Sequence, residues 1–252
     1  MDKRWLLLIA LTLGAIIALI AYGPIPQWLD YHNFADQRGM WGIPNFLNVI
    51  TNVPFFFIGA YGMWRSVKNW SQRPDITARL IPVVLFFGIF IVSFGSGYYH
   101  WKPTNATLVW DRLPMTLMFM PLFALIIYDF ISKDAGKWAF LISVPLGLFS
   151  IWYWNYTESI GAGDLRIYAM VQFFPLVAGP LILWLWPKKV PYLKNIIWLV
   201  VYYILAKLFE EFDDEVFNTI FIMSGHSIKH LFGAFALYHA SEVVWGWEKS
   251  LE

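Results

Sequence analysis

The sequence contains no cysteine among its 252 residues, and only 14% of its residues are charged. Without cysteine the chain forms no disulfide and offers no thiolate ligand, so a metal site would have to use His, Asp or Glu. Soluble domains carry about 25% charged residues. The low charge content, together with 59% hydrophobic residues, therefore indicates a chain surrounded by lipid. The net charge of +1 gives no support for nucleic acid as a partner.

Long apolar stretches dominate the chain, and a helix that crosses a bilayer needs about 20 such residues. Eight stretches qualify: 4–23, 46–64, 80–100, 107–129, 137–154, 166–187, 193–209 and 217–240. Short connections and uniform composition predict one transmembrane domain over 1–252, an all-α polytopic helix bundle. Lys3 and Arg4 precede the first stretch as in a signal peptide. Because that stretch is long and lacks a convincing cleavage site, we expect a retained helix.

Basic residues are distributed unequally between the connections that alternate from one side of the membrane to the other. One side collects twelve Lys and Arg residues and the other side five, with Lys229 left inside a helix. Cytoplasmic loops carry the excess of positive charge. We therefore expect both termini to face the cytoplasm.

Ionisable side chains within apolar stretches cost several kcal/mol unless they are paired, so each is a functional candidate. His226 and His230 are four residues apart and share one helical face. Ser96 and His100 repeat this spacing on another predicted helix, and Asp111 begins the next one. The predicted topology brings all five to a similar depth near the outer leaflet. Three imidazoles with an open fourth position are a common arrangement of catalytic zinc.

Each of these residues also has a simpler explanation. An intramembrane histidine can hydrogen bond to a neighbouring helix, Ser96 can bond to its own helix backbone, and Asp111 can stabilise a helix start. Their shared depth favours a metal centre over five separate explanations.

At these positions the chain resembles the alkaline ceramidase branch of a membrane hydrolase superfamily that also contains adiponectin-type receptors. The residues that carry the resemblance are Ser96-x-x-x-His100, Asp111, His226-x-x-x-His230, Tyr31–Arg38, Gly42–Asn45, Gly163–Arg166 and Ser224–His226. The similarity extends from about Tyr31 to His239, and these segments look like those of bacterial members. It implies a seven-helix core over 46–240, with 4–23 as an additional N-terminal helix, in a bacterial cytoplasmic membrane.

The resemblance also implies an activity: cleavage of the amide of ceramide, or of a related N-acyl membrane lipid, to a long-chain base and a fatty acid. His100, His226 and His230 would bind Zn²⁺, and Ser96 and Asp111 would complete the catalytic group, toward the outer leaflet. Animal members carry an acidic calcium site near the first core helix. Here Asp36 remains but Asn45 replaces a glutamate, which weakens the case for Ca²⁺.

Two alternatives to an enzyme remain open: a lipid-binding receptor or sensor on the same scaffold, and a proton or ion path. Ser96 and Asp111 beside the histidines favour the enzyme, and the sequence shows no inverted repeat of the transporter kind. The oligomeric state is not predicted.

Among the other polar residues, Lys207–Glu215 is predicted as a solvated helix end, or alternatively as a source of an acidic partner for Lys229. Asn48, Thr51 and Asn52 are predicted to bond between helices, and His32 to be solvated.

Overall fold

The computed structural model describes residues 2–251, which form helices and connections without a β-strand. This arrangement confirms the predicted all-α polytopic fold. The described chain divides into two compact units. Unit 1 contains the chain up to Trp28 and the segment Thr116–Lys189, and unit 2 contains Leu29–Met115 and the chain from Val190 onward. The single domain over 1–252 stays a prediction.

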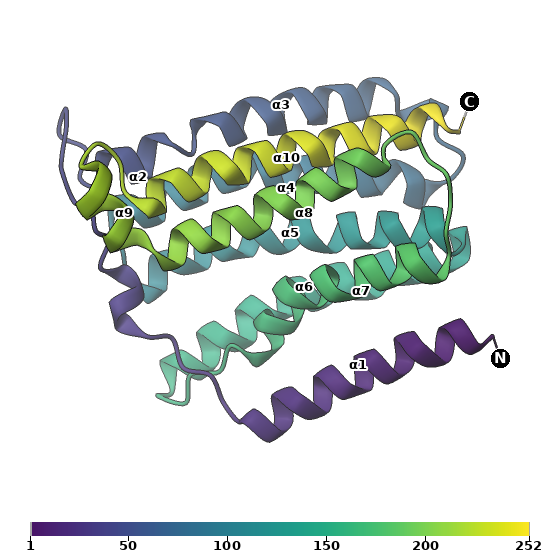
Figure 1. Ribbon diagram of the computed structural model, residues 1–252, viewed down its shortest axis with the longest axis horizontal. Coiled ribbons are helices and arrows are strands. Elements are labelled where there is room, and N and C mark those ends of the chain that lie inside the picture. The colour runs from purple at the N-terminus through teal and green to yellow at the C-terminus, as the bar shows by residue number, and fades with distance from the viewer. Residues whose placement is uncertain (1, 252) are drawn as a thin grey trace. The chain divides into compact units, whose positions relative to one another are not determined.

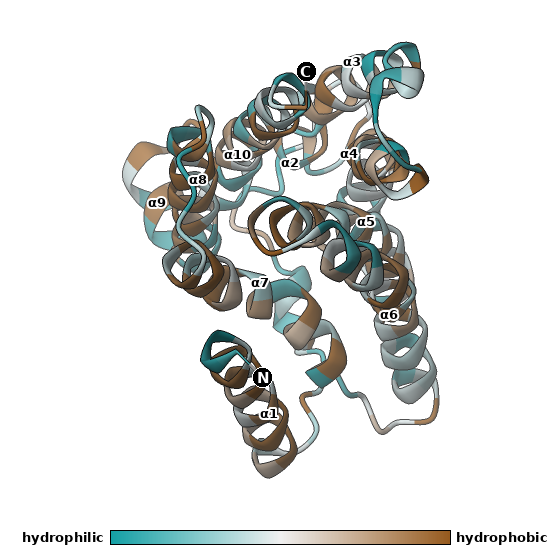
Figure 2. Cartoon of the chain, turned by 90° about the vertical axis from the view of Figure 1, so that its right-hand side faces the viewer, coloured by the Kyte–Doolittle hydropathy of each residue, from teal (hydrophilic) through white to brown (hydrophobic). Residues whose placement is uncertain are grey.

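Unit 1 is built from α1 (Lys3–Tyr22), the C-terminal half of α5 (Asn105–Phe130), α6 (Lys133–Ser159) and α7 (Arg166–Leu185). Helix α7 packs against both α1 and α6. No residue of α1 is buried, and most of its residues are hydrophobic (Figure 2). In the connection before α7, Asp164 pairs with Arg166 at 2.8 Å and accepts a hydrogen bond from Tyr153.

Unit 2 contains α2 (Phe46–Ile50), α3 (Val53–Lys68), α4 (Ile76–Trp101), the first part of α5, α8 (Leu193–Glu211), α9 (Asp213–Ile220) and α10 (Gly225–Lys249). Two short 3₁₀ turns, Leu29–His32 and Trp70–Gln72, lie in its connections. Helix α10 packs against α8 on one side and α3 on the other, and α3 packs on α4 (Figure 1).

Within residues 2–251, six helical segments are long and apolar enough to cross a membrane: α1, α2 with α3, α4, α5, α6 and α7. The pair α9 and α10 would make a seventh if it is counted as one span. These segments indicate a multi-pass integral membrane protein. Eight spans were predicted, so the structure differs at two of them.

The first difference is α8, which occupies the predicted 193–209 stretch and is 19 residues long but is not among the segments that qualify as spans. Its sequence includes the charged residues Lys194, Lys207, Glu210 and Glu211, and charge is what a spanning helix excludes.

The second difference is the predicted helix 217–240, which is wrong as one continuous element. A bend of 105° separates α9 from α10, and α10 then continues to Lys249. Phe221 has the left-handed φ of 60° that ends α9. A smaller break interrupts 46–64 at Thr51 and Asn52, where Pro54 lies in the first turn of α3. Both breaks place functional candidates at or near helix ends.

Candidate functional site

The start of α10 determines where two of the predicted ligands lie. Ser224 is the N-cap of this helix and accepts a hydrogen bond from the Ser227 backbone at 3.3 Å. His226 therefore falls in the first helical turn and His230 one turn later. Gly225 permits this start, because a Cβ there would lie 2.2 Å from the Phe209 carbonyl oxygen of α8.

The three histidines meet in unit 2, where their side chains are almost fully buried. The ring centroid of His100 lies 4.8 Å from the centroids of both His226 and His230, which are 5.3 Å from each other. One nitrogen from each ring falls within 4.8 Å of the other two. The His100 and His230 Nε2 atoms are 3.1 Å apart. A tetrahedral ion with bonds of about 2.0–2.1 Å needs ligand nitrogens about 3.3 Å apart, and the His100–His230 distance is close to this value.

Thr51 determines which nitrogen of His230 is available. The Thr51 hydroxyl donates its proton to the Leu47 carbonyl at 2.7 Å, so at 2.8 Å from His230 Nδ1 it can only accept. His230 therefore carries its proton on Nδ1 and directs the Nε2 lone pair at the other two rings. A hydrogen bond that fixes the tautomer in this way is typical of metal-binding histidines.

His226 Nε2 is also suited to bind a metal, because this buried atom has no hydrogen-bond partner among the described residues. Burying an imidazole nitrogen without a partner is unfavourable, and coordination of a cation would satisfy it. Since the chain has no thiol, the donor set is three imidazoles, which suits zinc. The residues present thus fit a metal ion.

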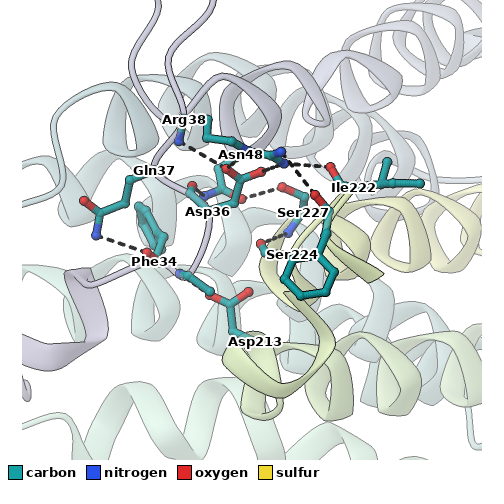
Figure 3. Close-up of polar contacts among 11 residues, drawn as sticks. Phe34, Asp36, Gln37, Arg38, Asn48, Asp213, Ile222, Ser224 and Ser227 are labelled. Atoms are coloured by element: carbon teal, nitrogen blue, oxygen red, sulfur yellow. Dashed lines mark hydrogen bonds and ion pairs between the residues drawn. The ribbon is translucent and has the colours of Figure 1, made fainter. Parts of the chain in front are cut away.

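Segment 34–38 covers the histidine cluster. The Phe34 ring is buried and lies 4.9 Å from the His100 ring and 4.5 Å from the His226 ring, measured between centroids. Asp213 joins this segment to the start of α10, because its carboxylate accepts from the backbone of Ala35 at 2.9 Å and of His226 at 2.6 Å. Figure 3 shows Phe34 on the segment before α2 and Asp213 on the segment that leads to α10.

A second set of polar contacts holds α2 and α10 together beside the cluster. Ser227 donates to Asn48 at 2.5 Å, and Asn48 donates to the Asp36 carbonyl at 3.2 Å (Figure 3). Asn45 donates to the carbonyl of His100 at 2.8 Å.

The interhelical role predicted for Asn48 is confirmed, as is that of Thr51, which reaches His230. The prediction for Asn52 was wrong, because its amide donates to the carbonyls of Asn48 and Val49 in its own segment.

Ser96 and Asp111 are also brought together, by the close approach of α4 and α5. The Ser96 hydroxyl interacts with the Asp111 carboxylate, and both residues are buried. Gly95 allows this contact, because a Cβ at that position would lie 1.9 Å from the Trp110 carbonyl oxygen. Lys229 and Arg112 are the cations near Asp111.

Glu210 is the acidic partner of Lys229, at 2.6 Å. It also pairs with Lys207 and accepts a hydrogen bond from the Tyr31 hydroxyl at 2.9 Å. The alternative role predicted for the acidic run, as a source of a partner for Lys229, is confirmed.

The prediction for His32 was wrong. Its ring is half-buried, with Nδ1 2.9 Å from the Tyr99 hydroxyl and Nε2 2.8 Å from the Asn105 amide oxygen. Both partners lie far along the chain, so local sequence carried no sign of them.

Among known protein families, the ceramidase model matches residues 40–247. That range covers most of the chain and includes all five candidate site residues. The chain belongs to the ceramidase family. Membership supports a hydrolase that acts on the amide of a membrane lipid. No curated protein matches the sequence.

In this ceramidase-family chain, Asp36 is engaged by Arg38, whose Nε and Nη2 donate to the carboxylate at 2.8 Å each. Burial raises the pKa of Asp36, but the hydrogen bonds from the Arg38 side chain and backbone outweigh it and hold the pKa below its ordinary value. The carboxylate that could attract calcium is thus neutralised by an arginine.

Proposed function

We propose that this protein is a zinc-dependent intramembrane hydrolase that cleaves the amide of ceramide or a related N-acyl lipid. The observation that carries the proposal is the convergence of His100, His226 and His230, with the tautomer of His230 fixed by Thr51. Family membership supports the reaction type.

Held by His100, His226 and His230, a zinc ion would polarise the substrate carbonyl and lower the pKa of a water molecule to about 7. Asp111 is the proposed general base that accepts a proton from the attacking water. It then returns a proton to the nitrogen of the amide as the C–N bond breaks, which releases an amine and a fatty acid. The water supplies both the oxygen gained by the acid and the proton gained by the amine.

Ser96 has two proposed roles. Before the reaction its hydroxyl donates to the Asp111 carboxylate and orients it. As negative charge develops on the carbonyl oxygen, the same hydroxyl donates to that oxygen, a contribution of about 3 kcal/mol in other hydrolases.

The test combines metal analysis with a lipid assay on protein purified in mild detergent. We expect close to one zinc per chain and release of fatty acid from at least one N-acyl lipid in a panel. Asp111→Asn should keep the zinc and lose turnover, whereas His226→Ala should lose both. His239→Gln is the matched control, because His239 lies on the same helix but bonds to Asn195. Zinc without turnover on any lipid would favour a lipid sensor, and no zinc in the wild type would refute the proposal.

We also propose that α8 crosses the membrane, with its charged residues near its two ends, and that both termini face the cytoplasm and the site faces the outer leaflet. With eight alternating segments the basic residues divide twelve to five, and cytoplasmic loops carry the excess. The chain has no cysteine, so a single introduced one is a clean probe. Ser250→Cys should react with a membrane-impermeant reagent only after cells are opened, and Gly161→Cys in intact cells. The reverse pattern would invert the topology.

A further inference from the structure

Three non-glycine residues in the described chain have left-handed backbone: Trp41 at φ 53°, Asn45 at φ 47° and Phe221 at φ 60°. All three belong to unit 2, in the connection before α2 and in the turn between α9 and α10. Non-glycine residues hold this conformation only where surrounding contacts impose it, and such positions cluster at functional sites. The contacts that hold Phe221 are therefore informative.

Arg38 supplies those contacts. Its Nη1 donates to the Phe221 carbonyl at 3.1 Å and its Nη2 to the Ile222 carbonyl at 2.8 Å. The guanidinium also lies 5.0 Å from the centre of the Phe217 ring on α9. Asp36 fixes the other edge of the guanidinium, as Figure 3 shows. One side chain thus ties the segment before α2 to the turn between α9 and α10.

The turn that Arg38 holds determines the direction of His226. Only Ile222, Met223 and Ser224 separate Phe221 from the first residue of α10, and the helix axis changes direction by 105° across this break. Asp213, at the start of α9, bonds the backbone of His226 and of Ala35. Releasing the turn would therefore move the end of α10 that carries His226, while His230 keeps its separate hydrogen bond to Thr51.

We propose that Arg38 is a positioning residue of the metal centre: it holds the left-handed turn at Phe221 and so directs His226 toward His100 and His230. This inference rests on the metal binding in the proposed function. Arg38 itself contacts neither the histidine rings nor the reacting atoms, so it acts on the metal centre only through the turn at Phe221.

The experiment compares Arg38→Gln, Phe221→Gly and the double variant by zinc affinity, measured in competition with a chelating dye. Outer-shell changes at metal sites cost about 10–100-fold in affinity, and we expect a loss in that range for Arg38→Gln. Glycine adopts positive φ freely. Phe221→Gly alone should therefore stay close to wild type, and in the double variant it should restore most of the lost affinity. Arg38→Lys replaces Arg38→Gln in this measurement if the Gln variant does not fold. It should also lose zinc affinity, because an ammonium group cannot form the same forked pair of hydrogen bonds.

Arg166→Gln is the matched control, because Arg166 makes the same Asp-x-Arg pair with Asp164 in unit 1. It should leave zinc affinity unchanged. The inference is overturned if Arg38→Gln binds zinc like wild type, if Arg166→Gln is equally damaging, or if Phe221→Gly rescues nothing.

Hydrogen exchange of peptides covering 221–230 provides a readout that does not need metal. Arg38→Gln should raise exchange there, and the added Phe221→Gly should lower it again; unchanged exchange in Arg38→Gln contradicts the inference. Wild-type protein that binds no zinc refutes the proposed function, whereas normal zinc binding in Arg38→Gln refutes only the role of Arg38.

Discussion

Replacing Thr51 by Val removes the group that fixes the tautomer of His230 and changes little else. Val keeps the branched shape of Thr but has no hydroxyl. In the wild type the buried Thr51 oxygen accepts from His230 Nδ1 at 2.8 Å. In the variant, either the buried N–H loses its partner or the proton moves to Nε2, where it would occupy the lone pair needed by the metal.

The expected magnitude follows from two independent considerations. Leaving a buried donor without a partner costs about 1–3 kcal/mol. Loss of an outer-shell hydrogen bond weakens metal binding by about 10–100-fold, which corresponds to about 1.4–2.8 kcal/mol. The two ranges agree, so we expect Thr51→Val to raise the zinc dissociation constant by one to two orders of magnitude.

The assay is competition for zinc between purified protein and a chelating dye, with two controls. Thr51→Ser keeps the hydroxyl and should bind like wild type. Thr12→Val removes the same hydroxyl-to-backbone bond, from Thr12 to Leu8, in α1, and should also bind like wild type. The reasoning is refuted if Thr51→Val retains wild-type affinity, or if the Ser and Val variants at position 51 are equally weak.

Three further predictions test other parts of the molecule. Gly95→Ala should force α4 and α5 apart, because its Cβ would lie 1.9 Å from the Trp110 carbonyl oxygen. We expect turnover to fall at least tenfold while the zinc content stays the same, and unchanged turnover would contradict this. Glu210→Gln should lower the free energy of unfolding by about 3–5 kcal/mol, because it removes the carboxylate that pairs with two lysines. Lys207→Met leaves Glu210 paired with Lys229 and should lower it less. Denaturant unfolding in detergent measures both values, and a larger loss in Lys207→Met would contradict this expectation. Asp36 has a lowered pKa when folded, so its contribution to stability is present above its unfolded pKa of about 3.9 and disappears as the pH falls through the folded value. Melting temperatures of wild type and Asp36→Asn should therefore differ at pH 7 and converge toward pH 2, and a constant difference would exclude this origin.

Much of the fold was predictable because a bilayer imposes a simple requirement on sequence. Backbone groups in lipid must be satisfied within the helix, so spans appear as long apolar runs whatever their neighbours are. That rule located α1, α4, α5, α6 and α7. It failed where charge or a break intervened, at α8 and at the turn around Phe221, because a hydropathy window does not detect a backbone turn held by a distant arginine.

The residues of the candidate site were likewise predictable only in part. Residue type and four-residue spacing were sufficient to select His226 and His230 on one helix face, and topology was sufficient to bring Ser96, His100 and Asp111 to a similar depth. Thr51, Asp213 and Gly95 were not recognised as parts of the site. Thr51 acts on a ring 179 residues away, and Gly95 matters only because another backbone lies against it.

The sequence by itself therefore determined the membrane environment, most of the helices and the side chains available to bind a metal. These depend only on composition and on the spacing of residues along a helix. The tertiary structure alone decided the tautomer of His230, the start of α10 and the pairing of Ser96 with Asp111. Each of these depends on the direction of a hydrogen bond or on the approach of two backbones, and such contacts exist only once distant segments have packed together.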